Sequence, residues 1–149
     1  MLKLTGVLLL TDIAITRADV SGRIVNGYEA ADGDIPYMVY LTAEDKYVTN
    51  SYKTCGGSII GNTWVLTAGH CVCERTPVII SYGSTDRRTP QFKHIVSGDD
   101  IFLHPTYDKY SLIFDIALLR TPYVEFSSRV NKVKNRIRIF YIKARSSIL

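Results

Sequence analysis

Apolar residues along this chain gather into short runs and do not recur with a helical period. The runs are rich in Ile, Val and Tyr and are separated by Gly, Pro, Asp and Asn, which is the pattern of strands joined by turns. We therefore expect an all-β fold in which antiparallel strands form a small barrel. The predicted strands are Ile35–Leu41, Ser58–Thr67, Val78–Tyr82, Ile95–Val96 with Ile101–Leu103, and Ile116–Leu119.

Residues 1–18 have the layout of a signal peptide. Lys3 supplies a positive charge, an apolar run follows at Leu4–Leu10, and the small residue Ala18 stands at the expected cleavage point. Asp12 interrupts the apolar character, and the alternative is a disordered or buried N-terminus. No uncharged apolar run approaches the roughly 20 residues that a bilayer requires. We expect a secreted, extracellular chain with no membrane span.

Charge is unevenly distributed along the chain, whose net charge is +4. Residues 129–149 hold seven basic groups and no acidic one, so residues 1–128 carry 11 basic and 14 acidic groups, a net charge of −3. The basicity therefore belongs to the C-terminal segment, and the body is not that of a nucleic-acid-binding protein. We expect no nucleic acid partner, and only a weak contact between that segment and anionic surfaces.

Two short motifs carry candidate chemistry. The first, Leu66-Thr67-Ala68-Gly69-His70-Cys71, places His70 in a Gly-containing turn directly after an apolar strand. The second, Phe114-Asp115-Ile116-Ala117-Leu118-Leu119, places Asp115 between apolar neighbours. A rigidly held imidazole suits a general base, and a carboxylate in apolar surroundings needs a hydrogen-bond partner. The sequence therefore offers a candidate base and a candidate acid.

These motifs resemble segments of the trypsin/chymotrypsin-like serine endopeptidases. Each motif alone is weak, but several of them in family order are together specific. The resemblance runs from about residue 23 to about residue 134. We interpret the divergent basic tail, residues 135–149, as translated sequence beyond a true exon; an amphipathic strand and a polybasic membrane-surface segment are the alternatives. The further matching segments are Arg23-Ile24-Val25-Asn26-Gly27, Cys55-Gly56-Gly57-Ser58-Ile59-Ile60 and His104-Pro105-Thr106-Tyr107.

The resemblance implies a fold of two Greek-key barrels with the active site between them. This chain supplies about one of the two, the N-terminal barrel at residues 24–134. In the family the catalytic His is the general base and the catalytic Asp orients it, which assigns these roles to His70 and Asp115. The nucleophilic Ser is expected after Asp115 in a Gly-rich turn, yet the last glycine of the sequence is Gly98. We expect a truncated chain that is inactive as given.

The same resemblance implies maturation by proteolysis. Residues 19–23 would be a short activation propeptide, and an activating protease would cut between Arg23 and Ile24 to free the Ile24 α-amino group. It also implies a disulfide between Cys55 and Cys71.

Cys73 is then left as an unpaired thiol, as a thiol whose partner lies in missing sequence, or as one half of an intermolecular bridge. No metal or organic cofactor is expected, because Cys71-Val72-Cys73 lacks zinc spacing and a loop around Val78–Gln91 has few acids for calcium. His94 is interpreted as a surface residue and His104 as a loop residue.

Two functions remain open. The first is that of a secreted serine endopeptidase whose parent chain cleaves protein or peptide substrates by acyl transfer. The alternative is a non-catalytic secreted protease homologue that acts as a binding protein. The specificity pocket of the family lies outside the segment that this chain matches, so the resemblance implies no cleavage preference.

Overall fold

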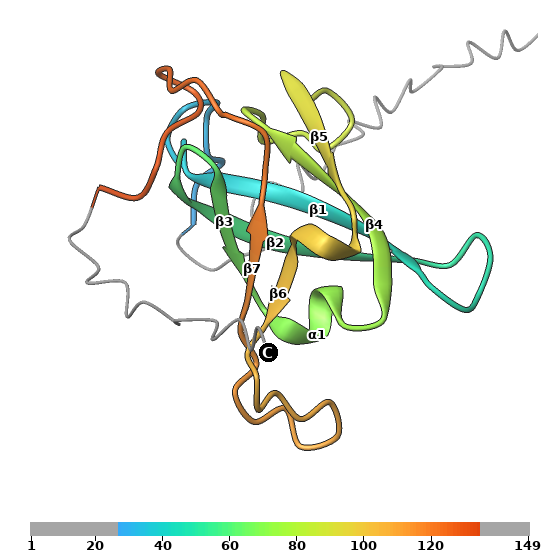
Figure 1. Ribbon diagram of the computed structural model, residues 1–149. Helices are drawn as coiled ribbons and strands as arrows, with labels where there is room; N and C mark the ends of the chain where they lie inside the picture. The colour runs from blue at the N-terminus through green and yellow to red at the C-terminus, as the bar shows by residue number, and fades with distance from the viewer. Residues whose placement is uncertain (1–26, 135–149) are drawn as a thin grey trace, which may run out of the picture.

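The computed structural model describes residues 27–134, which form one antiparallel sheet of seven strands (Figure 1). The all-β prediction is confirmed. A four-residue helix, α1 (Gly69–Val72), and a 3-10 turn, η1 (Gly98–Asp100), complete the regular elements of this part. The strands are β1 (Met38–Asp45), β2 (Tyr52–Gly61), β3 (Trp64–Thr67), β4 (Arg75–Tyr82), β5 (Phe92–Val96), β6 (Ile101–Leu103) and β7 (Ala117–Arg120).

Four sequence predictions concern segments outside the described residues. These are the signal peptide at residues 1–18, the propeptide at residues 19–23, the cleavage site at Arg23 and Ile24, and the basic tail at residues 135–149. They stay predictions. Within residues 27–134, no helix is both long enough and apolar enough to cross a membrane.

The strand order identifies a Greek key. Along the sheet the strands follow in the order β5-β4-β1-β2-β3-β7-β6. The strands β1, β2 and β3 are consecutive neighbours, and β4 returns to pair with β1 on the far side. Three consecutive strands with the fourth beside the first define the motif.

The sheet curls into a barrel because its two edges are tied together. The edge strands β5 and β6 are separated in sequence only by residues 97–100, a connection that spans at most ~18 Å. In a flat sheet, six inter-strand spacings would hold these edges ~29 Å apart. The short connection is compatible only with a curved sheet, as Figure 1 shows.

The core lies inside this curved sheet. Alternate residues of β1 and β4 point inward and are at most 1% exposed. Burial of each large apolar side chain contributes about 1.5–3 kcal/mol. The core residues of these two strands are Val39, Leu41, Ala43, Val78, Ile80 and Tyr82.

His94 differs from its predicted surface position. Measured between ring centroids, its imidazole lies 5.3 Å from Tyr82 and 5.5 Å from Phe92. Its Nδ1 is buried and has no hydrogen-bond partner among the described residues. Burial lowers the pKa of His94. The alternation along β5 explains the difference, because His94 shares the partly buried side of that strand with Phe92 and Val96.

The predicted strand at Ser58–Thr67 is in fact a hairpin. The chain turns at Asn62 and Thr63, and Ile59 of β2 pairs with Val65 of β3. The beginning of β2 was not predicted from sequence because adjacent glycines are poor strand formers. Gly57 belongs there because a Cβ at this position would lie 3.0 Å from side-chain atoms of both Val39 and Val65.

Candidate active site

Strand pairing brings the two candidate catalytic residues together. The antiparallel ladder between β3 and β7 ends with Thr67 opposite Ala117. His70 follows this end of β3, and Asp115 precedes the same end of β7. Residues that lie 45 positions apart in sequence therefore meet beyond one end of the ladder. The register of this ladder determines whether the two side chains can touch.

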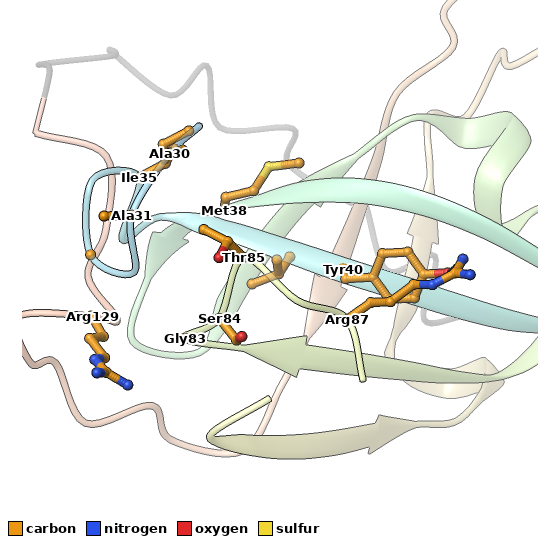
Figure 2. Close-up of a pocket in the computed structure, with 12 residues that line it drawn as sticks. Ala30, Ala31, Ile35, Met38, Tyr40, Gly83, Ser84, Thr85, Arg87 and Arg129 are labelled. Carbon is orange, nitrogen blue, oxygen red and sulfur yellow. Dashed lines mark hydrogen bonds between the residues drawn. The ribbon is translucent and has the colours of Figure 1, made fainter. Parts of the chain in front are cut away.

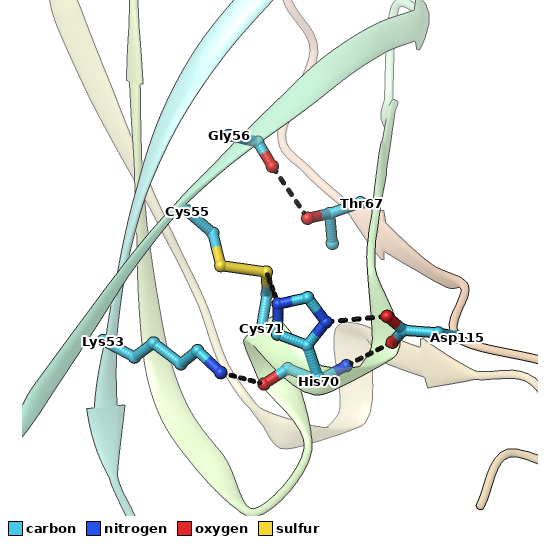
Figure 3. The surroundings of a disulfide bond; sticks show 7 residues. All are labelled: Lys53, Cys55, Gly56, Thr67, His70, Cys71 and Asp115. Carbon is cyan, nitrogen blue, oxygen red and sulfur yellow. Dashed lines mark hydrogen bonds and ion pairs between the residues drawn. A yellow bond between two sulfur atoms is a disulfide. The ribbon is translucent and has the colours of Figure 1, made fainter. Parts of the chain in front are cut away.

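Two hydrogen bonds hold the Asp115 carboxylate against His70 (Figure 3). The imidazole Nδ1 lies 2.7 Å from Oδ2 of Asp115, and the backbone N–H of His70 donates to Oδ1 at 2.7 Å. The His70 side chain is 38% exposed and that of Asp115 is 24% exposed. The acid is thus held at both oxygens, while the imidazole stays accessible to a reacting group.

The protonation of this pair follows from its hydrogen bonds. The bond from the His70 imidazole is the main cause that lowers the pKa of Asp115; the backbone N–H groups of His70 and Gly69 add to it, and desolvation opposes it. The carboxylate is therefore ionised at neutral pH and can only accept, so Nδ1 carries the proton. In the neutral imidazole, Nε2 then keeps a free lone pair. Such an arrangement can accept a proton from a nucleophile.

A disulfide fixes the segment that carries the base. Cys55 of β2 is bonded to Cys71 of α1, which confirms the predicted bridge. Lys53 of the same strand donates from Nζ to the backbone oxygen of His70 at 3.2 Å. The Nε2 atom of His70 lies 3.5 Å from the Cys71 Sγ. A disulfide sulfur has no proton to give, so the Nε2 lone pair is not consumed there.

The ligand atoms of Cys55, His70 and Cys71 lie within 4.8 Å of one another, as in a metal site. Because the two sulfurs are bonded to each other, neither offers the thiolate that binds a metal. This cluster does not fit a metal ion. Cys73 is a partly buried free thiol with no disulfide partner between residues 27 and 134.

Gly69 allows the backbone to approach the acid closely. A Cβ at this position would lie 3.1 Å from the Tyr107 ring and 3.3 Å from Oδ1 of Asp115. Gly69 therefore lies close to both the Tyr107 ring and the Asp115 carboxylate. The motif His104-Pro105-Thr106-Tyr107 resembles a family segment, but the sequence predicts no role for its residues. The pattern of apolar and polar positions does not indicate that Tyr107 lies near Asp115.

Sequence reasoning also missed Phe114, the residue before the acid. Its φ is +55°, in the left-handed region that bulky residues rarely occupy. Its ring is stacked on the His104 imidazole, with centroids 4.7 Å apart and planes 13° apart. Gly and Asn are the residues that commonly adopt a left-handed backbone, so a Phe at this position does not predict one.

The His70 imidazole is not bonded to a serine in the part of the chain that the structure describes. Between residues 27 and 134, no serine hydroxyl is hydrogen-bonded to His70. Ser127, which follows Asp115 in sequence, accepts the backbone N–H of Val130 at 3.1 Å and closes a local turn.

A separate hollow lies on another part of the described chain (Figure 2). It has a volume of about 310 Å³ and contains neither His70 nor Asp115 in its lining. Its two arginines have partners on the protein: Arg87 donates to the Tyr40 hydroxyl at 3.4 Å, and Arg129 lies 3.4 Å from Asp32. This pocket is separate from the candidate active site.

The loop around Val78–Gln91 does not offer free acids. Its one carboxylate, Asp86, is bridged to Arg88 at 2.7 Å, and that hydrogen bond is the main cause that lowers the pKa of Asp86 to about 2.

Comparison with known proteins identifies close relatives. A family model described as Trypsin matches residues 24–141, beyond the predicted end of the resemblance at residue 134. "Serine protease 1" of Drosophila melanogaster is 49% identical over 116 residues, which are 78% of this chain and 42% of the relative. "Collagenase" of Hypoderma lineatum is 34% identical over 115 residues, 76% of this chain and 42% of the relative.

A solved structure entitled HL collagenase shares the fold. Its TM-score is 0.65 at 31% identity, and the match covers 74% of this chain and 46% of that chain. The chain therefore spans less than half the length of the relatives that it matches. The barrel, its histidine turn and the extent of the family match place the chain in the trypsin family of serine proteases.

Proposed function

We propose that this chain carries the general base and the orienting acid of a serine-type endopeptidase. His70 would take the proton of a serine hydroxyl at Nε2 as that oxygen attacks a peptide carbonyl, and would then give it to the leaving amine. Asp115 would hold the imidazole in the required tautomer. The observation that carries this proposal is the two-point hydrogen bonding of the Asp115 carboxylate to His70.

The exposed surface beside the pair supports a further packing partner. An open groove beside Asp115 is lined by residues of β2, β3 and the segment before β7. Met38 and Ile116, which line it, are 51% and 37% exposed. We infer that the second half of the family's domain packs here and supplies the nucleophile and the oxyanion donors. The 149-residue chain alone is then inactive.

The disulfide supports a secreted location. Such bonds persist in oxidising compartments and are rare in the cytosol. Together with the signal-peptide layout of residues 1–18, the Cys55–Cys71 bridge favours an extracellular protease precursor. Protein or peptide substrates, and activation by a protease that cuts after Arg23, are parts of this proposal.

The alternative function is a non-catalytic secreted protease homologue. Between residues 27 and 134, no serine hydroxyl is hydrogen-bonded to the His70 imidazole, and this observation favours the non-catalytic homologue. In that case the barrel is a binding module, and the seven basic groups of residues 129–149 make weak contacts with anionic surfaces.

A chimera separates the two functions. In Drosophila Serine protease 1, the matching segment is replaced by residues 24–134 of this chain, and hydrolysis of a panel of peptide nitroanilides is measured. We expect turnover that falls roughly 10⁶-fold in His70→Ala and about 10⁴-fold in Asp115→Asn. The unmodified 149-residue chain, measured beside it, gives no turnover.

Asp108→Asn is the matched control. Asp108 is a carboxylate of the same loop that accepts hydrogen bonds from Ser111 and Tyr110 and has none with His70. Its chimera keeps full activity. A folded chimera without activity, or one whose activity survives His70→Ala, overturns the endopeptidase proposal and favours the binding protein.

A further inference from the structure

The backbone bends sharply at the residue that carries the acid. Phe114 has a φ of +55°, and the N–H of Ile116 donates to the Phe114 carbonyl at 2.7 Å. Asp115 is therefore the middle residue of a three-residue turn. In such a turn, the conformation of the preceding residue determines the direction in which the central side chain points.

The Phe114 side chain is not held by the core. It is 56% exposed, and the parallel imidazole of His104 is the one aromatic ring stacked on it among residues 27–134. Left-handed backbone is unfavourable for a residue of this kind unless its surroundings hold it in place. The stack on His104 is the contact that can do so.

His104 is itself held firmly. Its N–H donates to the carbonyl of Ile116 at 3.1 Å, and its carbonyl accepts the N–H of Tyr107 at 2.9 Å. Its Nδ1 accepts from the backbone N–H of Thr106 at 3.3 Å and lies 3.0 Å from the Thr106 hydroxyl. The imidazole is thus fixed in position and orientation, and it offers Phe114 a rigid surface.

We propose that Phe114 is a positioning residue: stacked on His104, it keeps the left-handed turn that points the Asp115 carboxylate at His70. The importance of this position for catalysis rests on the proposed function. The geometric statement does not, because it concerns only the hydrogen bonds of one carboxylate in this chain.

Leu112 provides an internal comparison. Its φ is also +55°, it is 50% exposed, and it belongs to the same loop. It lies two residues before the first residue of the three-residue turn, and it has no ring to stack on His104. A substitution there disturbs a left-handed residue without removing the stack.

The test measures the pKa of the Asp115 carboxyl by ¹³C NMR in the complete 149-residue chain. His70→Ala defines the full effect, because it removes the hydrogen bond that is the main cause of the lowered pKa. We expect Phe114→Val and His104→Ala each to raise the pKa of Asp115 by at least half of that effect. Phe114→Tyr, which keeps a stacked pair of rings and leaves His104 bonded to Thr106, leaves it as in the unmodified chain.

Leu112→Val is the matched control and leaves the pKa of Asp115 unchanged. The proposal is overturned if His104→Ala, a change on the surface of the loop, leaves this pKa unchanged in a folded chain. It is equally overturned if Leu112→Val moves the pKa as far as Phe114→Val does, since the effect is then general loosening of the loop. An inactive chimera leaves this readout intact, so the two proposals fail separately.

Discussion

The inner faces of β1 and β4 and the loop between β6 and β7 are held together in different ways. In β1 and β4, every second side chain is buried in the core and the backbones are paired along almost their whole length. In the loop, at residues 104–116, apolar side chains are exposed and two non-glycine residues are left-handed. Order in the loop comes from hydrogen bonds, from the ion pair between Lys109 and Glu74, and from the stack of Phe114 on His104.

The two regions therefore determine different properties: the core determines the stability of the barrel, and the loop determines the geometry of the candidate site. The core stabilises the barrel through the buried area of many apolar side chains. The loop contributes little buried area but determines where the Asp115 carboxylate points. A change in the core should therefore lower the free energy of unfolding, whereas a change in the loop should alter the site with little loss of stability.

The largest expected effect comes from Leu41→Ala. Leu41 is fully buried in β1, so the truncation leaves a cavity and lowers the free energy of unfolding by about 2–5 kcal/mol. Leu112→Ala, the same truncation in the half-exposed loop, lowers it by about 0.5 kcal/mol or less. Urea denaturation of the two variants measures the difference. Equal losses would contradict the separation of core from loop.

A smaller effect is expected from removal of the disulfide, which joins β2 to α1. The bridge between Cys55 and Cys71 closes a sequence separation of 16 residues. The double variant Cys55→Ala/Cys71→Ala should lose about 3 kcal/mol of unfolding free energy. Cys73→Ala removes a thiol of the same segment without opening a loop and serves as control. A double variant as stable as this control would show that the bridge does not constrain the unfolded chain.

The smallest effect is the pH dependence that His94 gives to the core. Its lowered pKa means that the unfolded chain binds a proton at a higher pH than the folded chain does. Stability from the neutral imidazole is therefore complete above about pH 6.5 and falls as the pH drops from there toward the folded pKa. His94→Phe keeps a ring beside the stacked Tyr82 and Phe92 rings and should remove the slope of the unfolding free energy against pH in this window. An unchanged slope would assign the pH dependence to other groups.

The residues that sequence predicted well are those whose chemistry is carried by a motif. His70 and Asp115 were named from their flanking residues, and the structure places their side chains 2.7 Å apart, although their catalytic roles stay a prediction. The Cys55–Cys71 bridge was implied in the same way. Each of these depends on a short segment whose residue types are unusual.

What sequence could not predict depends on contacts between distant segments. Nothing in the residue type of Phe114 indicates a left-handed backbone, because the stack that holds it needs His104 in a particular place. The beginning of β2 was missed because Gly57 is selected by the closeness of Val39 and Val65, which are neighbours only in the folded sheet. His94 was misjudged for a similar reason, since its burial follows from the pairing of β5 with β4.

The topology also determines when, during folding, His70 and Asp115 come together. The strands β1, β2 and β3 are successive hairpins that can form from neighbouring sequence, and His70 follows them directly. Asp115 reaches it only when β7 pairs with β3, across a separation of about fifty residues. Closing such long loops is the slow part of folding for β proteins. On a growing or refolding chain the base is therefore present without its acid, and the pair forms only as the barrel nears completion.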